Sequence, residues 1–259
     1  MNSENSDSEK NIAYERLNAF RKVIESLADI VDKMEIKCSD SGLDIQVMDS
    51  MHVALADVHF SRETFTSYRC DRDVQLGIPI KHFLTVLRGI ALEEKSLLRF
   101  SCEDEPQALK IEHILPNSQF EFDITLYQIG TESYSVPELE FDTKVRMPSE
   151  QFRNISRLIG SFGEYINFEC EDKRLVVKQN GDLIKNNMSL KPNEETVFID
   201  ATAPVNLEIA MKYVNIVNKV STLSSEVRVN LGNSTPVFFE VDIGSIGYIK
   251  FYIAPKAQN

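Results

Sequence analysis

Residues 17–48, LNAFRKVIESLADIVDKMEIKCSDSGLDIQVM, combine one helical pattern with two alternating ones. Over residues 17–31 the apolar side chains fall three or four positions apart, which is typical of a helix with one buried face. MEIKCS (34–39) and LDIQVM (43–48) then alternate with a period of two, and Asp40-Ser41-Gly42 supplies a turn between them. The segment therefore predicts a helix followed by a pair of antiparallel strands.

The same pattern returns in the second half of the chain. Phe20, Cys38 and Leu43 recur 132 positions later as Phe152, Cys170 and Leu175. A second set follows at nearly the same offset: Ile78-Pro79-Ile80 with Ala203-Pro204-Val205, Arg99 with Arg228, Pro106 with Pro236, and Ile111 with Val241. We therefore expect two copies of one α+β fold, each with helices on one face of antiparallel sheets.

The repeat suggests where the domains begin and end. We expect an N-terminal domain at residues 11–125, a connecting loop at 126–141 and a C-terminal domain at 142–259. The connector sequence TLYQIGTESYSVPELE (125–140) has no sustained period, and a loop this long in a compact chain is usually functional or flexible. The polar residues 1–10, MNSENSDSEK, are expected to be a disordered extension.

Composition restricts the cellular compartments in which we expect the protein. No apolar run approaches the ~18 residues of a membrane span, and the first ten residues lack the apolar centre of a signal peptide. We therefore expect the protein to stay inside the cell, away from membranes. The four cysteines lie 32, 32 and 68 positions apart without a CxxC pair, so we expect reduced thiols packed in strands rather than metal ligands.

The charge pattern points toward DNA despite a formal net charge of -12. The second, third and fourth expected helices carry six cations against Glu150 and Glu208, a balance of +4, and the cations lie four or seven positions apart on one face of each helix. The first helix adds two more. These eight residues are Arg21, Lys22, Lys81, Arg88, Arg153, Arg157, Lys212 and Lys219. Their faces lack aromatic residues for stacking bases, so we expect contacts with phosphates of duplex DNA that are indifferent to sequence.

Four separated motifs resemble one known family. LDIQVMDSMHVAL (43–55), YRCDRDVQLGIPI (68–80), VRMPSEQF (145–152) and YIKFYIAPK (248–256) are similar to the proliferating cell nuclear antigen family of eukaryotic DNA sliding clamps. The resemblance runs in order from about residue 12 to residue 256. It implies a non-enzymatic, homotrimeric ring of clamp-fold domains around duplex DNA, joined through edge strands near 118–126 and 183–190, without cofactor, metal or catalytic residue.

The resemblance also implies nuclear clients. The family acts as a processivity factor for replicative DNA polymerase, and clamp loader, flap endonuclease and ligase dock through a peptide motif in an apolar groove. The matching groove positions are Met48, His52, Val53, Leu55, Val136, Pro137, Pro236, Tyr252, Ile253, Ala254 and Pro255. The same resemblance places Arg21, Lys22, Arg88, Arg157, Lys212 and Lys219 against DNA, whereas Lys81 and Arg153 join them from the helical pattern alone.

Some positions depart from the family pattern. Ala28 and Thr85 stand where lysines are usual, so the DNA-facing surface should be less basic. Asp172 occupies the place of the lysine that the family modifies, and Lys173 follows it. Tyr134 stands in the connector where a leucine is common.

Two other functions remain open at this point. A subunit of a heterotrimeric checkpoint clamp would share the fold, but such subunits resemble the replicative clamp only faintly. A hydrolase or metal enzyme using some of the 40 Asp and Glu residues is the alternative from another class. No phosphate-cradling glycine loop or HExxH motif supports that alternative, and His52, His59, His82 and His113 form no recognisable constellation.

Overall fold

The structure of the protein is a computed structural model. It describes residues 2–91, 96–128, 130, 134, 138–193 and 195–257, and it describes side chains from Glu15 onward. The chain forms two compact units. Unit 1 comprises residues 1–47, 58–133 and 245–247, and unit 2 comprises residues 48–57, 134–244 and 248–259.

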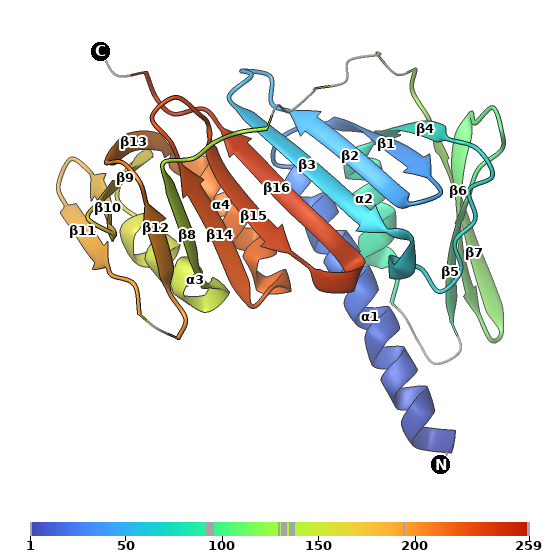
Figure 1. The fold of residues 1–259 in the computed structure, drawn as a ribbon. Coiled ribbons are helices and arrows are strands. Elements are labelled where there is room, and N and C mark those ends of the chain that lie inside the picture. Colours follow the sequence, from blue (N-terminus) through green and yellow to red (C-terminus); the bar gives the residue numbers. More distant parts are fainter. Residues whose placement is uncertain are drawn as a thin grey trace. The chain divides into compact units, whose positions relative to one another are not determined.

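Unit 1 contains two helices and two antiparallel sheets. Strand β1 lies between β2 and β4, β3 follows β2 in the strand order, and β6 lies between β5 and β7. The elements are α1 (Asn2–Leu27), β1 (Lys33–Ser39), β2 (Gly42–Met48), β3 (Ala54–Ser61), β4 (Val74–Pro79), α2 (Ile80–Gly89), β5 (Leu97–Ser101), β6 (Ala108–Leu115) and β7 (Ser118–Thr125). Figure 1 shows α1 and α2 together behind the strands β1, β2 and β3.

Unit 2 repeats this arrangement. Its sheets have the strand orders β12-β8-β14-β15-β16 and β11-β10-β9-β13, all antiparallel. The elements are β8 (Thr143–Pro148), α3 (Ser149–Ile159), β9 (Tyr165–Glu171), β10 (Arg174–Asn180), β11 (Lys185–Leu190), β12 (Phe198–Ala201), β13 (Val205–Ala210), α4 (Met211–Val220), β14 (Glu226–Leu231), β15 (Val237–Asp242) and β16 (Gly247–Ile253). Helices α3 and α4 contact each other behind β8, β14 and β15 (Figure 1).

The arrangement confirms the expected α+β class and the repeat. Strands β1 and β9 begin 132 residues apart, at Lys33 and Tyr165, and helices α1 and α3 end 132 residues apart, at Leu27 and Ile159. Even a cross-strand ion pair is repeated. Arg99 lies opposite Glu112 in β5–β6 at 3.4 Å, and Arg228 lies opposite Glu240 in β14–β15 at 2.9 Å.

Two of the sequence pairings in the second set are wrong. Pro79 ends β4, whereas Pro204 precedes β13, so the residue equivalent to Pro79 is Ala210 at the end of β13. Ile111 corresponds to Phe239 rather than Val241, because these two residues adjoin the matched Glu112 and Glu240 in the ladders. Loops of different length shift the offset between the halves, and short apolar patterns around a proline recur by chance.

Phenylalanines join the helices to the sheets at the centre of each unit. In unit 1 the ring of Phe20 on α1 lies 4.8 Å from that of Phe60 on β3 and 6.1 Å from that of Phe83 on α2. In unit 2 Phe152, the repeat partner of Phe20, lies 6.0 Å from Phe239 on β15. Both phenylalanines are buried seven residues before the end of their helix, although their ring partners Phe60 and Phe239 lie on strands that are not equivalent in the repeat.

Helix α1 is longer than its apolar pattern predicts. Its backbone is helical from Asn2, so the described residues 2–10 are helical where we expected disorder. Residues 2–16 contain neither glycine nor proline, so nothing in their sequence stops the helix. Helix α1 ends at Leu27, within the predicted stripe, and Ala28 continues into a turn by donating to the Ile24 carbonyl.

The four cysteines are free, as expected, but only two lie in strands. Cys38 is in β1 and the buried Cys170 is in β9, whereas Cys70 lies in a loop and the exposed Cys102 follows the end of β5. The alternating patterns near Cys70 and Cys102 do not reach these two residues, so neither cysteine lies in a strand. Burial raises the pKa of the Cys38 thiol to about 12, and the neighbouring Cys102 and Cys70 add to this, so the thiol stays protonated.

We predict that Phe239→Ala destabilises the protein by about 3–5 kcal/mol, because it removes a wholly buried ring from between α3 and the sheets. The measurement is the free energy of unfolding in urea. Phe198→Ala is the matched control, since Phe198 is 41% exposed on β12 and its removal should cost far less. Equal losses in the two variants would contradict the assignment of Phe239 to the core.

Candidate nucleic-acid and peptide interfaces

The two α2 cations predicted to meet phosphate each lie against an acidic side chain. Lys81 Nζ lies 2.6 Å from Asp32 Oδ1, and Arg88 Nε lies 2.8 Å from Glu25 Oε1. Both cations remain exposed, with 74% and 62% of their side-chain surface accessible. Exposed pairs of this kind contribute little to stability, so a phosphate could displace the carboxylate at little cost. The pairs nevertheless reduce the positive potential of this helix.

The α1 cations of unit 1 are less accessible than those of α2. Arg21 is half-buried, and its Nη2 donates to the carbonyl of Ile90 at 2.9 Å. Its Nε is buried and makes no hydrogen bond with any described residue. Lys22 is also half-buried. Arg21 therefore helps to hold the end of α2 beside α1 in addition to any contact it makes outside the protein.

Unit 2 presents its cations more openly. Helix α3 buries Phe152, Ser156 and Ile159, which leaves Arg153 half-buried and Arg157 exposed four positions later. Helix α4 buries Tyr213, Val217 and Val220 among others, and it exposes both Lys212 and Lys219. The apolar spacing therefore turns these cations away from the core.

The cations of unit 2 also differ in their electrostatic neighbours. Within the described part of the chain, neither Arg157 nor Lys212 has a carboxylate within salt-bridge distance. Arg157 Nη2 instead donates to Asn154 Oδ1 at 3.1 Å, and Lys212 Nζ lies 4.5 Å from the centre of the Tyr213 ring. Neither cation forms an ion pair as Lys81 and Arg88 do, although the charge of Lys212 acts on the nearby Asp49 carboxylate. Helices α3 and α4 are therefore the stronger candidate surface for phosphate.

Most predicted groove residues come together in unit 2. The amide of Ala254, just after β16, donates to the carbonyl of Val53 at 2.8 Å and so joins the C-terminal segment to residues 48–55. Met48, Val53, Pro236 and Tyr252 are half-buried there, and His52, Ala254 and Pro255 are exposed. Leu55 is only 8% exposed and contributes mainly to the core. The accessible apolar side chains lie on three segments that are far apart in the sequence.

One predicted groove residue is buried, and two others lie outside the described residues. Ile253 is completely buried, because alternation along β16 points it to the face opposite Tyr252, so only its backbone could reach a ligand. Val136 and Pro137 lie outside the described residues. The candidate groove residues among the described ones therefore come from the segments at 48–55, 236 and 252–255.

An aromatic row that we did not predict extends the groove surface. The ring of Tyr252 lies 5.2 Å from that of Phe238 on β15, and Phe238 lies 5.6 Å from Phe141. All three rings line a cavity of about 760 Å³ that also reaches Phe198 and Arg146. The register of β15 with β16, which places Phe238 opposite Tyr252, was the missing information. The alternating pattern in VFFEVD (237–242) could have suggested which face of the sheet Phe238 occupies.

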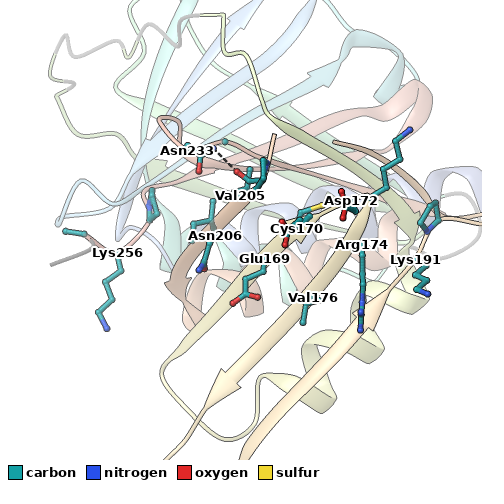
Figure 2. A pocket seen from close by; sticks show the side chains of 18 residues that line it. Glu169, Cys170, Asp172, Arg174, Val176, Lys191, Val205, Asn206, Asn233 and Lys256 are labelled. Carbon is teal, nitrogen blue, oxygen red and sulfur yellow. Dashed lines mark hydrogen bonds between the residues drawn. The ribbon is translucent and has the colours of Figure 1, made fainter. Parts of the chain in front are cut away.

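A second and larger cavity of unit 2 lies elsewhere, and both acidic and basic side chains line it. It measures about 1290 Å³ and is lined by Glu169, Arg174, Lys191 and Lys256, among others (Figure 2). Glu169 is bound by Lys178, and burial raises the pKa of the Cys170 thiol above its ordinary value. These groups are therefore not arranged as a nucleophile with an activating base. Of the predicted site residues, the cavity includes only Pro255.

Within the described residues, no group of three or more His, Cys, Asp and Glu side chains is placed to hold a metal ion. None of the described helices combines the length and the apolar character needed to cross a bilayer.

Comparison with known proteins covers nearly the whole chain. The family model described as "Proliferating cell nuclear antigen, N-terminal domain" matches residues 11–134, and the model of the corresponding C-terminal domain matches residues 135–256. The chain is also similar to the proliferating cell nuclear antigen of Chaetomium thermophilum. The two are 32% identical over 253 residues, which cover 93% of this chain and 96% of that protein.

The difference between the units predicts unequal contributions to DNA binding. Arg157→Glu/Lys212→Glu should weaken binding of a duplex oligonucleotide more than Lys81→Glu/Arg88→Glu, because only the latter cations already have carboxylate partners. Each lost phosphate contact should flatten the slope of log K against log salt by about 0.9. Fluorescence anisotropy at several salt concentrations measures both quantities.

The control is Lys144→Glu/Lys250→Glu, which changes net charge equally at strand positions on β8 and β16. It should leave the slope close to that of the parent. Equal effects of all three double variants would show that only net charge matters and that the helices are not the contact surface.

Proposed function

Since the chain belongs to the proliferating cell nuclear antigen family of DNA sliding clamps, which are processivity factors and not enzymes, we propose that three copies close into a ring around duplex DNA. In this ring each subunit contributes four helices to the inner surface and its sheets to the outer one. The basic helices then meet phosphates, and closure retains the ring on DNA while weak contacts let it slide. The protein would act in the nucleus.

Two sheet edges support ring closure. Among the described residues, β7 pairs only with β6 and β11 pairs only with β10, so each strand has one side of its backbone without a strand partner. Long exposed edges promote aggregation, and soluble proteins usually cover or pair them. Pairing β7 of one subunit with β11 of the next would satisfy both edges at once. This is a heterologous interface, which closes when the rotation per subunit completes a circle.

Side chains near these edges fit the same interface. Phe120 on β7 is 52% exposed, and on the other edge Leu158 of α3 and Ile184 beside β11 are 64% and 45% exposed. Helix α3 contacts β11, since Asn186 Nδ2 donates to the carbonyl of Ile159. β7 carries Glu121 and Asp123, whereas β11 carries Lys185, so the two edges are complementary in charge. These edges are the observation that carries the proposal of a ring.

The groove around Tyr252 would dock the partners of the ring. We propose that replicative DNA polymerase, clamp loader, flap endonuclease and ligase place aliphatic and aromatic side chains of a client motif there. Half-buried apolar groups such as Met48, Val53 and Pro236 suit such anchors, because a bound peptide would remove their remaining apolar surface from water. The neighbouring cavity beside Phe238 offers room for residues that flank the motif.

Self-assembly tests the ring and separates it from a heterotrimeric checkpoint clamp. Light scattering of the pure protein should give a mass about three times 29.5 kDa, because one chain supplies both edges. Phe120→Asp should give monomers, since a carboxylate would be buried without a partner. Phe198→Asp, at the edge strand β12, should remain trimeric. A parent protein that stays at 29.5 kDa would overturn the homotrimer.

Peptide binding tests the groove. Tyr252→Ala should lose about 2 kcal/mol or more of binding energy for a client-motif peptide of a flap endonuclease, because it removes an aromatic wall of the groove. Isothermal titration calorimetry provides the measurement. Tyr165→Ala, at a 37% exposed tyrosine elsewhere in unit 2, is the control and should bind normally. Unchanged affinity in Tyr252→Ala would place the peptide on another surface.

A further inference from the structure

One carboxylate organises the loop that leads into the proposed client groove. Asp49 is only 7% exposed, and its Oδ1 accepts from the amides of Val53 at 2.7 Å and Ala54 at 2.9 Å. Its Oδ2 accepts from the hydroxyl of Tyr213 at 2.5 Å. Three donors therefore converge on one buried side chain, which is the arrangement that stabilises a carboxylate away from water.

The loop itself has a conformation that needs such support. His52 has φ 56°, in the left-handed region that residues other than glycine rarely adopt. The amide of His52 donates to the Asp49 carbonyl at 3.0 Å, and the Asp49 amide donates to the Ala54 carbonyl at 3.0 Å. Side-chain and backbone bonds of Asp49 together hold the chain in this tight turn. Without them the strained conformation would compete with more open ones.

Tyr213 connects this loop to helix α4. It lies 164 residues from Asp49 in the sequence, and its side chain is 3% exposed. Burial and the neighbouring Asp49 raise the pKa of Tyr213, so its hydroxyl remains a donor. Burial acts to raise the pKa of Asp49 as well, but the bonds from Tyr213, Ala54 and Val53 outweigh it and keep the carboxyl ionised. The pair is thus a charge-assisted hydrogen bond between two fixed groups.

The position of the loop determines one wall of the groove. His52 and Val53 are proposed groove residues, and the Val53 carbonyl accepts from the amide of Ala254, a proposed groove residue of the C-terminal segment. A shift of the turn would therefore move both the side chains of His52 and Val53 and the backbone link to the C-terminal segment. Preorganised loops bind peptides more tightly because less conformational entropy is lost on binding.

We infer that Tyr213 is a positioning residue for the client groove: through Asp49, its hydroxyl holds residues 48–54 in the shape that accepts the client peptide. Tyr213 itself is buried on α4 and does not line the groove. Its effect on clients is therefore indirect. This inference rests on the proposed client-docking function and adds a residue that controls it from the helix layer.

The test compares two tyrosine-to-phenylalanine variants. Tyr213→Phe should weaken binding of a fluorescein-labelled flap endonuclease client peptide about tenfold, because the loop loses a charge-assisted bond. Tyr68→Phe is the matched control. Its hydroxyl is likewise a hydrogen-bond donor, with its proton shared between the carbonyls of Ser39 at 2.7 Å and Gly42 at 2.9 Å, but Tyr68 lies in unit 1. It should lower the melting temperature without changing peptide affinity.

Asp49→Asn separates positioning from general stability. If Tyr213 acts through Asp49, the double variant should lose less affinity than the sum of the two single losses on a logarithmic scale. Full peptide affinity in Tyr213→Phe, with the parent binding normally, would overturn the inference. So would an equal loss in Tyr68→Phe. If the parent protein itself does not bind the peptide while remaining trimeric, the proposed client groove fails instead.

Discussion

The backbone hydrogen bonds that β7 and β11 leave unmade are the constraint on which the proposed assembly depends. Each strand ends its sheet among the described residues, and exposed apolar side chains, Phe120 on one edge and Leu158 and Ile184 near the other, accompany the open backbone. A monomer would expose both edges to water and to aggregation. Pairing one edge with the other would remove this exposure at β7 and β11 and, when repeated from subunit to subunit, would close a ring. Assembly and soluble folding are then two results of the same set of bonds.

The proposed ring would explain why a protein with a negative net charge carries cations on its helices. The chain has a net charge of -12, yet its helices gather cations, and in unit 1 two of these are paired with Asp32 and Glu25. In the proposed ring, such a surface would bind duplex DNA weakly and without reading bases. Weak contact is what a sliding protein requires, because tight contacts would stop it. Helix α4 links this function to the groove, since Lys212 neighbours the Tyr213 that holds the loop at Asp49.

The fold was largely accessible from the sequence because the repeat is encoded in local patterns. Phe20 and Phe152 recur within the repeat, and both are buried seven residues before the end of their helix. What the sequence did not reveal depends on pairing between distant segments. Neither alternation nor helical spacing shows that Tyr213 meets Asp49, or that Lys81 lies beside Asp32. The register of the strands and the lengths of the loops, which decide these contacts, leave little trace in a single sequence.

Topological retention on DNA tests the central claim most directly. The protein should be loaded by a clamp loader with ATP onto nicked circular DNA and then washed at a salt concentration that dissociates phosphate contacts. A closed ring should stay on the circle through the wash and be released when the circle is cut once, because a ring can slide off a free end. Equal loss from circular and linear DNA in the wash would show that affinity alone holds the protein. Retention after cutting, on ends left unblocked, would equally contradict a sliding ring.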